Sequence, residues 1–184
     1  MFCLIDIMVV LNSADCFDFM KNTRILYFKG TERWYFMRIE RIDRVVIAVK
    51  NLDESIKFFS DLLGIKFDPA GSSDELLVRA AYSPSGIELM EASHPESPVG
   101  KFVEKRGEGL YAVVFKVSNI EEATAELERK GIRKVGKLDL GALKEVIFHP
   151  KDTHGAMIIL AEYEDVHPAT AAVAMGLLQS QKLG

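Results

Sequence analysis

Two stretches of the chain repeat one pattern of hydrophobic and polar positions. In the first, residues 41–49 form a β-branched run of strand length, and residues 51–64 follow with apolar side chains at helical spacing. Asn51 is placed to cap this helix and Gly64 to end it. Two or three strands are expected next, over residues 65–69, 75–82 and 86–92. The pattern therefore predicts a β-α-β-β-β unit.

The same order of elements returns in the second half of the chain. Residues 110–117 have the pattern of a strand and residues 118–131 that of a helix, with Asn119 in the place of Asn51, an offset of 68 (119 − 51). Three more strands are expected over residues 132–136, 144–149 and 155–163. Neither unit alone covers both faces of its sheet, so the two must pair. We predict an α+β fold in which two tandem βαβββ modules form a curved mixed sheet around one cleft.

The remaining segments give the domain organisation. Residues 37–164 hold the two modules, 38–92 and 110–164, joined by a linker with a short helix. Residues 1–36 are either a genuine extension that covers a sheet edge or an over-long start ahead of Met37. Residues 165–184 are expected to form a C-terminal helix that docks on the body or on a partner subunit, since Pro168 suits a first helical turn.

Composition narrows the classes of partner. The chain has 184 residues, 48% of them hydrophobic and 27% charged, and a net charge of −4. There is no Lys/Arg cluster with interleaved aromatics, so we expect neither nucleic acid nor membrane as a partner. No segment has the roughly 18 uninterrupted apolar residues of a membrane span. Cys3 and Cys16 show no disulfide pattern, which predicts a reducing, cytoplasmic location.

Three motifs occur in an order that carries a family likeness. They are RIDRVVIAVKNLDESIKFFSDLLGIKF, then SPVGKFVEKRGEGL, then HPKDTHGAMIIL. Together they resemble methylmalonyl-CoA epimerases of the vicinal oxygen chelate (glyoxalase/bleomycin resistance/dioxygenase) superfamily. The likeness covers about residues 37–164. It implies the paired β-α-β-β-β fold, a small-molecule ligand and a homodimer.

The resemblance also implies a divalent metal held by four inward side chains, which would stabilise an enolate formed beside a carbonyl. Carried over one position at a time, the first-strand histidine falls on Arg44 and the second-module histidine on Ala112. The final-strand glutamate falls on Ile159, and Glu88 alone keeps a possible ligand. A guanidinium, a methyl and a branched alkane do not bind a divalent cation. We therefore predict no metal and no other cofactor.

Alternation along the strands predicts what surrounds these positions. Side chains two residues apart on a strand share one face of a sheet. The cleft is therefore expected to be mainly apolar, with Arg44 and Glu88 as its central charged pair and Lys116 at its rim. The predicted substrate-binding residues are Val46, Ala48, Met90, Ala112, Val114, Lys116, Met157 and Ile159.

The central pair has two interpretations. As catalytic residues, Arg44 would provide a fixed cation for an oxyanion or a carboxylate, and Glu88 would be a base made stronger by partial burial. Alternatively, the two form a structural ion pair that fills the place of the metal. Because an unpaired buried charge is very costly, pairing is expected on either interpretation.

Other polar residues are weaker candidates. His149 and His154 bracket a loop and could, with His94, bind a metal or act as acid and base, but the pattern favours turn residues. Tyr111 alternates to the opposite face and is expected to pack. Glu91 and Glu162 are expected to be solvated.

Three functions remain open from the sequence. The first is a metal-independent isomerase, lyase or hydratase acting on a small carbonyl or acyl compound. The second is a binding protein of the bleomycin-resistance type that sequesters a hydrophobic ligand. The third is an inactive relative that dimerises with an active one.

Overall fold

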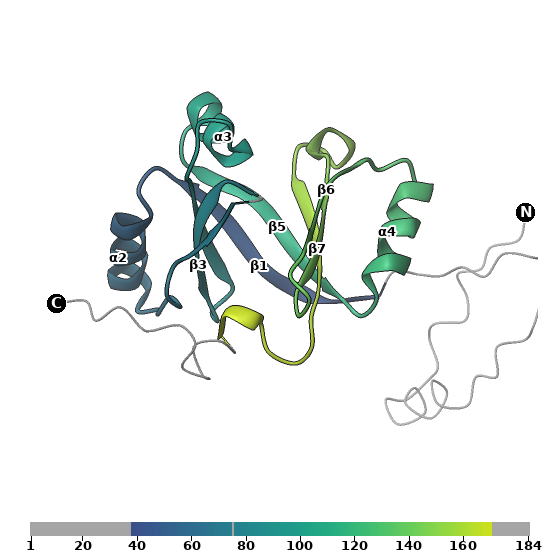
Figure 1. The fold of residues 1–184 in the computed structure, drawn as a ribbon, viewed down its shortest axis with the longest axis horizontal. Helices are drawn as coiled ribbons and strands as arrows, with labels where there is room; N and C mark the ends of the chain where they lie inside the picture. Colours follow the sequence, from purple (N-terminus) through teal and green to yellow (C-terminus); the bar gives the residue numbers. More distant parts are fainter. Residues whose placement is uncertain (1–37, 75, 171–184) are drawn as a thin grey trace, which may run out of the picture. The chain divides into compact units, whose positions relative to one another are not determined.

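The described part of the chain is built around one sheet. The computed structural model describes residues 38–170 except residue 75, and the predicted extension 1–36 lies outside these residues (Figure 1). Eight strands form a sheet in the order β2-β3-β4-β1-β5-β8-β7-β6. The predicted α+β class and the curved mixed sheet are confirmed.

The elements follow the chain in two equivalent sets. The first module consists of β1 (Ile39–Val49), α2 (Leu52–Leu63), β2 (Gly71–Ser73), β3 (Val78–Ser83) and β4 (Ile87–Ala92). The linker carries α3 (Pro98–Arg106). The second module consists of β5 (Gly109–Val117), α4 (Ile120–Arg129), β6 (Lys134–Asp139), β7 (Lys144–Phe148), a 3₁₀ turn (Pro150–Asp152) and β8 (Met157–Glu162).

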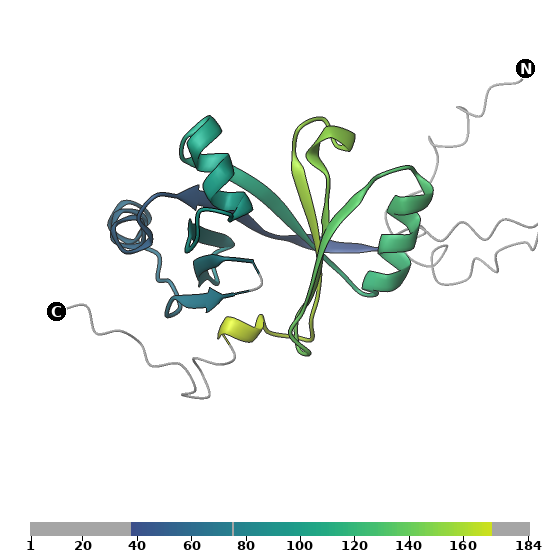
Figure 2. The same cartoon turned by 45° about the horizontal axis from the view of Figure 1, so that its top comes forward.

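The two modules meet edge to edge at their first strands. β1 and β5 pair antiparallel, whereas β1 pairs with β4 and β5 with β8 in parallel. Each half therefore repeats the same strand order outward from the centre. In Figures 1 and 2, β1 and β5 cross the middle of the described region, and α2 and α4 lie on its two flanks. This arrangement leaves the inner face of the curved sheet between the modules.

The helix caps follow the sequence prediction. The Asn51 side chain accepts a hydrogen bond from the Glu54 amide at 3.1 Å, and the Asn119 side chain accepts one from the Glu122 amide at 2.9 Å. Each asparagine thus satisfies one free N–H of its helix's first turn. Gly64 ends α2 in the left-handed conformation, with φ of 67°.

One predicted strand is wrong. Residues 65–69 are not a strand, and the edge strand β2 begins only at Gly71. Pro69 has no N–H to donate to a ladder. The Asp68 amide still donates to the Tyr82 carbonyl at 2.7 Å, and Phe67 packs against a buried cluster, so the segment is anchored without regular pairing.

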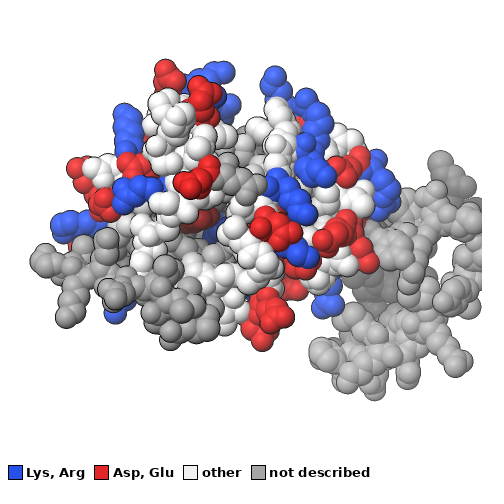
Figure 3. Space-filling view, viewed as in Figure 1, with Lys and Arg blue, Asp and Glu red and all other residues white. Residues whose placement is uncertain are grey.

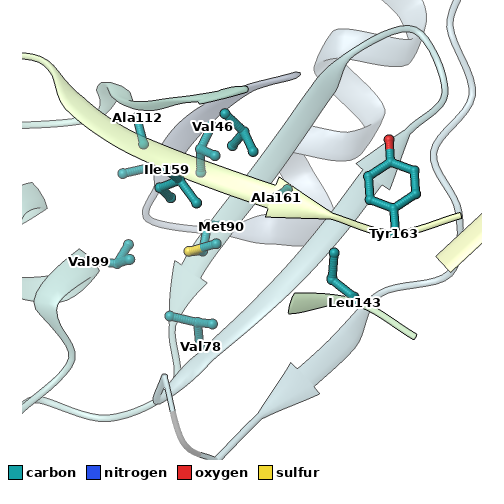
Figure 4. Packing of buried hydrophobic residues seen from close by; sticks show 11 residues of the cluster. Val46, Val78, Met90, Val99, Ala112, Leu143, Ile159, Ala161 and Tyr163 are labelled. Atoms are coloured by element: carbon teal, nitrogen blue, oxygen red, sulfur yellow. The ribbon is translucent and has the colours of Figure 1, made fainter. Parts of the chain in front are cut away.

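Apolar side chains form three clusters that follow strand alternation. Two of them pack β-strand residues under α2 and α4, on the outer faces of the modules. The third joins both modules on the inner face, where side chains from several strands point toward one another (Figure 4). Its buried members include Val46, Ala48, Val78, Met90, Val99, Ala112, Val114, Leu143, Ile159, Ala161 and Tyr163.

The chain leaves β8 toward the first module. A helix begins at Pro168, where the sequence pattern places a first turn, and the predicted helix beyond residue 170 lies outside the described residues. Within residues 38–170, none of the helices is long and apolar enough to cross a membrane. On the face drawn in Figure 3, acidic and basic side chains are interspersed.

Candidate functional site

A buried arginine lies at the centre of the inner face. Arg44, whose side chain is 3% exposed, donates from Nε to Glu88 Oε2 at 2.7 Å and from Nη1 to Asp43 Oδ2 at 2.7 Å. Its Nη2 donates to Glu145 Oε1. Three carboxylates therefore surround one guanidinium. Burial would lower the pKa of Arg44, but Glu88 and Glu145 raise it well above its ordinary value, so Arg44 is a fixed cation.

The curl of the sheet brings these groups together. Glu88 comes from β4, the neighbour of β1, where it pairs with Val46. Glu145 comes from β7, which is separated from β1 by β5 and β8 in the strand order. The guanidinium thus connects the two modules across the inner face. The predicted Arg44–Glu88 pairing is present, with a second module's carboxylate added to it.

A β-bulge places Asp43 in the site. Ile42 pairs with Phe115 and Arg44 with Val114, so Asp43 is an extra residue on β1. A bulge breaks alternation and redirects the side chain of the extra residue. Asp43 consequently contacts Arg44, its immediate neighbour, and is itself buried.

Tyr163 and Arg41 complete the hydrogen bonds around Asp43. The Tyr163 hydroxyl donates to Asp43 Oδ1, and Arg41 Nη2 donates to the Tyr163 oxygen at 2.7 Å and to Asp43 Oδ1 at 3.3 Å. Burial alone would raise the pKa of Asp43, but the Tyr163 hydrogen bond and Arg44 outweigh it and lower the pKa. Asp43 is therefore held as a carboxylate.

Glu145 behaves differently from Asp43. Burial raises the pKa of Glu145, and the lowering effect of Arg44 does not cancel this rise. Glu88 and Asp43 add to the rise because their negative charges oppose a third one. Asp43 and Glu145 are thus chemically distinct although both bond to Arg44.

The segment after β8 covers this polar network. His167 stacks on Tyr82 of β3 at 4.0 Å between ring centroids and meets Tyr163 edge-on at 5.3 Å. It therefore touches both modules. Burial, followed by the charge of Arg44, lowers the pKa of His167 to about 4, which leaves the imidazole neutral at pH 7.

A cavity lies beside the Arg41, Asp43 and Arg44 part of the network. It has a volume of about 410 Å³ and is lined by residues 41–45 of β1 and by the turn between β3 and β4. Tyr82, which pairs with Glu88 across β3 and β4, lies on its wall. The cavity is lined by Arg41, Ile42, Asp43, Arg44, Val45, Tyr82, Pro84, Ser85 and Gly86.

The structure also places the predicted binding residues. Six of the eight belong to the inner-face cluster as buried residues, and Met157 packs against it. Lys116 is buried near Tyr163, with its Nζ 4.7 Å from the ring centroid, and pairs with Glu40 at 3.1 Å. The residues thus share one face, where they pack against one another.

The four positions that the family resemblance marks for a metal do not supply a set of donors. Ala112 and Ile159 carry no donor atom, and Arg44 brings a positive charge to Glu88. Across residues 38–170 without residue 75, no group of three or more His, Cys, Asp or Glu side chains is placed to hold a metal ion. These residues do not fit a divalent cation.

The weaker candidates have local structural roles. His149 caps the 3₁₀ turn by accepting from the Lys151 amide, and His94 accepts from the Glu96 amide. Tyr111 packs edge-on against Phe102 at 5.2 Å. The expectation of solvation is wrong for Glu162, which accepts from the Ile120 amide at 2.6 Å and so caps α4.

Sequence reasoning missed five members of the hydrogen-bonded network and its cover: Arg41, Asp43, Glu145, Tyr163 and His167. For Glu145, strand alternation could have predicted its place in the site. Glu145 alternates with Ile147 on β7, and Ile147 packs on the inner-face cluster. A carboxylate in that inward series was therefore visible in the sequence.

Comparisons with known proteins show which family the chain belongs to. The model of the Glyoxalase/Bleomycin resistance protein/Dioxygenase superfamily matches residues 41–160. The chain belongs to this superfamily. It is 33% identical over 129 residues to human "Methylmalonyl-CoA epimerase, mitochondrial", a match that covers 66% of this chain and 73% of the relative.

Solved structures of superfamily members agree with this assignment. A Streptomyces coelicolor methylmalonyl-CoA epimerase in complex with 2-nitronate-propionyl-CoA has a TM-score of 0.65 and 26% identity, covering 70% of this chain and all of the other. The methylmalonyl-CoA epimerase of Mycobacterium tuberculosis has a TM-score of 0.64 and 30% identity, covering 73% of this chain and 93% of the other.

Proposed function

We propose that this superfamily member catalyses proton transfer at a carbon beside a carbonyl group, as a metal-independent isomerase or lyase. The observation that carries the proposal is the buried Arg44 guanidinium with three carboxylates around it. A structural ion pair needs one carboxylate for each cation. Surplus carboxylates around a fixed cation favour acid–base chemistry over simple charge neutralisation.

In this proposal Arg44 takes over the electrostatic role of the family's metal. The residues at the four carried-over positions include two without donor atoms, Ala112 and Ile159. A guanidinium has five N–H groups, and three of those on Arg44 donate to carboxylates. Nη1 and Nη2 each keep a second N–H, which can donate to a substrate oxygen. A permanent cation at this point stabilises developing negative charge without any change of protonation.

Glu88 is the proposed base. It removes the proton from the carbon beside the carbonyl, so that the C–H bond breaks and its electron pair forms a carbon–carbon double bond. The carbonyl electrons move to oxygen, and the resulting enolate accepts hydrogen bonds from Arg44. Return of a proton to the carbon restores the carbonyl compound, and the residues regain their first state.

The substrate class follows from the relatives and from the size of the cavity. One solved methylmalonyl-CoA epimerase binds 2-nitronate-propionyl-CoA, and another binds methylmalonyl-CoA. A cavity of about 410 Å³ next to Arg44 has room for a small acyl group, with a longer carrier outside it. We therefore propose a small carbonyl or acyl compound, with acyl thioesters as the first class to test.

The test is deuterium exchange. The protein is treated with a chelator and incubated in D₂O with methylmalonyl-CoA and with a panel of other small acyl thioesters, and exchange beside the carbonyl is followed by NMR. We expect exchange that persists in chelator and is lost in Glu88→Gln, with Glu91→Gln on the same strand as the matched control. Exchange that appears only after a divalent metal is added would refute the proposal.

The same assay distinguishes catalysis from the alternative function, which is ligand sequestration. Saturable binding of the 2-nitronate analogue with no exchange of any substrate would favour a sequestering protein of the bleomycin-resistance type. The chain's inner-face cluster is apolar, which is the observation behind that alternative. An inactive partner of another enzyme would show neither binding nor exchange alone.

The proposal also covers the oligomeric state and the cellular location. We propose that the protein works as a homodimer, as the family resemblance implies, and in the cytoplasm, because its two cysteines show no disulfide pattern. Sedimentation velocity measures the first and localisation of a fluorescent fusion the second. The human relative carries "mitochondrial" in its name, so a mitochondrial signal would correct the second.

A further inference from the structure

We propose that Glu145 carries a proton at neutral pH and is the acid of the site, paired with Glu88 as the base. This inference rests on the proposed function for its chemical role, but not for the position of the proton. Two guanidiniums, Arg41 and Arg44, face three carboxylates, those of Asp43, Glu88 and Glu145. One negative charge is therefore in excess.

The surroundings do not supply another cation for Glu145. Among the residues that the structure describes, its ion-pair partner is Arg44. Its neighbour Lys144 points away and pairs with Glu121 at 3.5 Å and with Glu162 at 3.9 Å. His167 is neutral at pH 7, since burial lowers its pKa to about 4. A protonated Glu145 removes the excess charge without another partner.

The three carboxylates are not equally able to hold the proton. Asp43 accepts hydrogen bonds from Arg41, Arg44 and Tyr163, all of which favour its charged form. Glu88 is bonded to Nε of Arg44, and its side chain is 13% exposed. The side chain of Glu145 is 8% exposed and has Arg44 as its bonded partner. Glu88 and Glu145 each have one bonded partner, and Glu145 is the more buried of the two, so burial disfavours its charge most, which selects Glu145.

Two ionised carboxylates on one guanidinium oppose each other. Glu88 and Glu145 bond to different nitrogens of Arg44, and their negative charges repel each other. Protonation of Glu145 removes this repulsion. The site then holds a base and an acid at the same time. In the proposed reaction, Glu88 accepts the proton from carbon and the O–H of Glu145 returns one, leaving Glu145 ionised until the proton passes back.

Infrared spectroscopy tests the position of the proton directly. Protonated carboxylic acids have a C=O stretching band that ionised carboxylates lack, and ¹³C-glutamate labelling moves the band only if it belongs to a glutamic acid. At pH 7 we expect one such band in the wild-type protein, shifted by ¹³C-glutamate. It should be lost in Glu145→Gln and keep its ¹³C-glutamate shift in Glu88→Asp, which preserves the number of carboxylates around Arg44. Glutamine is nearly isosteric with a neutral glutamic acid, so Glu145→Gln should fold.

Each outcome decides the inference. The absence of a labelled band in wild-type protein at pH 7 overturns it, and so does a band that survives in Glu145→Gln. If Glu145→Gln fails to fold, the labelled wild-type band is followed from pH 3 to pH 9 instead. A band that vanishes near the ordinary pKa of glutamate, roughly 4.3, overturns the inference. A band present in a protein without deuterium exchange would support the protonated Glu145 and refute the proposed function, so the two failures are distinguishable.

Discussion

The two modules have the same scaffold but different inward-facing chemistry. Both helices begin with an asparagine that caps the first turn, and both central strands pair in parallel with the last strand of their module. At the equivalent inward positions, however, the first module carries Arg44 and Glu88, whereas the second carries Ala112 and Ile159. Repetition has preserved the features that determine the fold and not those that determine the chemistry.

This difference shows why a repeat is informative about architecture and less so about function. A cap acts within its own helix, so it is needed in each copy. A site at the junction needs each group only once, from either module. The second module contributes Glu145 from β7 instead of a residue on its central or last strand. The site is therefore asymmetric within a nearly symmetric fold.

The largest expected effect comes from replacing the central cation. Arg44→Met should destabilise the protein by about 3–5 kcal/mol, because it leaves buried carboxylates without their partner. Ile159→Val, at an inward position of the second module, should cost only about 1 kcal/mol. Urea denaturation of both variants measures the difference. Similar losses in the two would show that the charged network contributes no more than ordinary packing.

The second largest effect is an expected loss of stability on acidification. His167 connects Tyr82 of the first module to Tyr163 of the second, and its pKa falls from 6.5 to about 4 on folding. Between these values the unfolded chain binds more protons than the folded one, so stability falls as the pH is lowered from about 6.5 to about 4. The shift corresponds to at most about 3 kcal/mol.

The control variant keeps an aromatic ring at position 167 but removes the titratable imidazole. His167→Phe retains an aromatic side chain against Tyr82, and its stability should depend less on pH between about 6.5 and 4. Thermal unfolding of both proteins across this range provides the comparison. An unchanged pH dependence in His167→Phe would assign the acid sensitivity to other groups.

The smallest expected effect tests the shared scaffold. Asn51→Ala and Asn119→Ala should each cost about 1 kcal/mol, since each removes one equivalent cap. The double variant should lose the sum, because the two helices lie on opposite flanks of the sheet (Figure 1). Unequal costs would indicate that the second helix depends on Glu162, which also caps it through the Ile120 amide.

The sequence predicted what alternation and local chemistry control. Both asparagine caps, the turn at Gly64 and the inward series from Val46 to Ile159 follow from the spacing of residues along single elements. The pairing of Arg44 with Glu88 was predictable because a buried charge requires a partner. These features need no knowledge of how distant segments meet.

The rest depends on interactions that spacing does not encode. Asp43 faces the site because a bulge interrupts the alternation of β1. Glu145 reaches Arg44 because the sheet curls, and His167 covers the site because the chain turns back from β8 to β3. Residues 65–69 have a strand's composition, yet Pro69 interrupts the ladder that they would need.

The central claim is that Arg44 stands in place of a metal ion, and metal binding tests it most directly. The purified protein is analysed for Co, Mn, Ni and Zn and then titrated with Co²⁺ by calorimetry. The account predicts far less than one equivalent per chain and no saturable binding at the site. One equivalent of metal per chain, lost in Glu88→Gln, would contradict it.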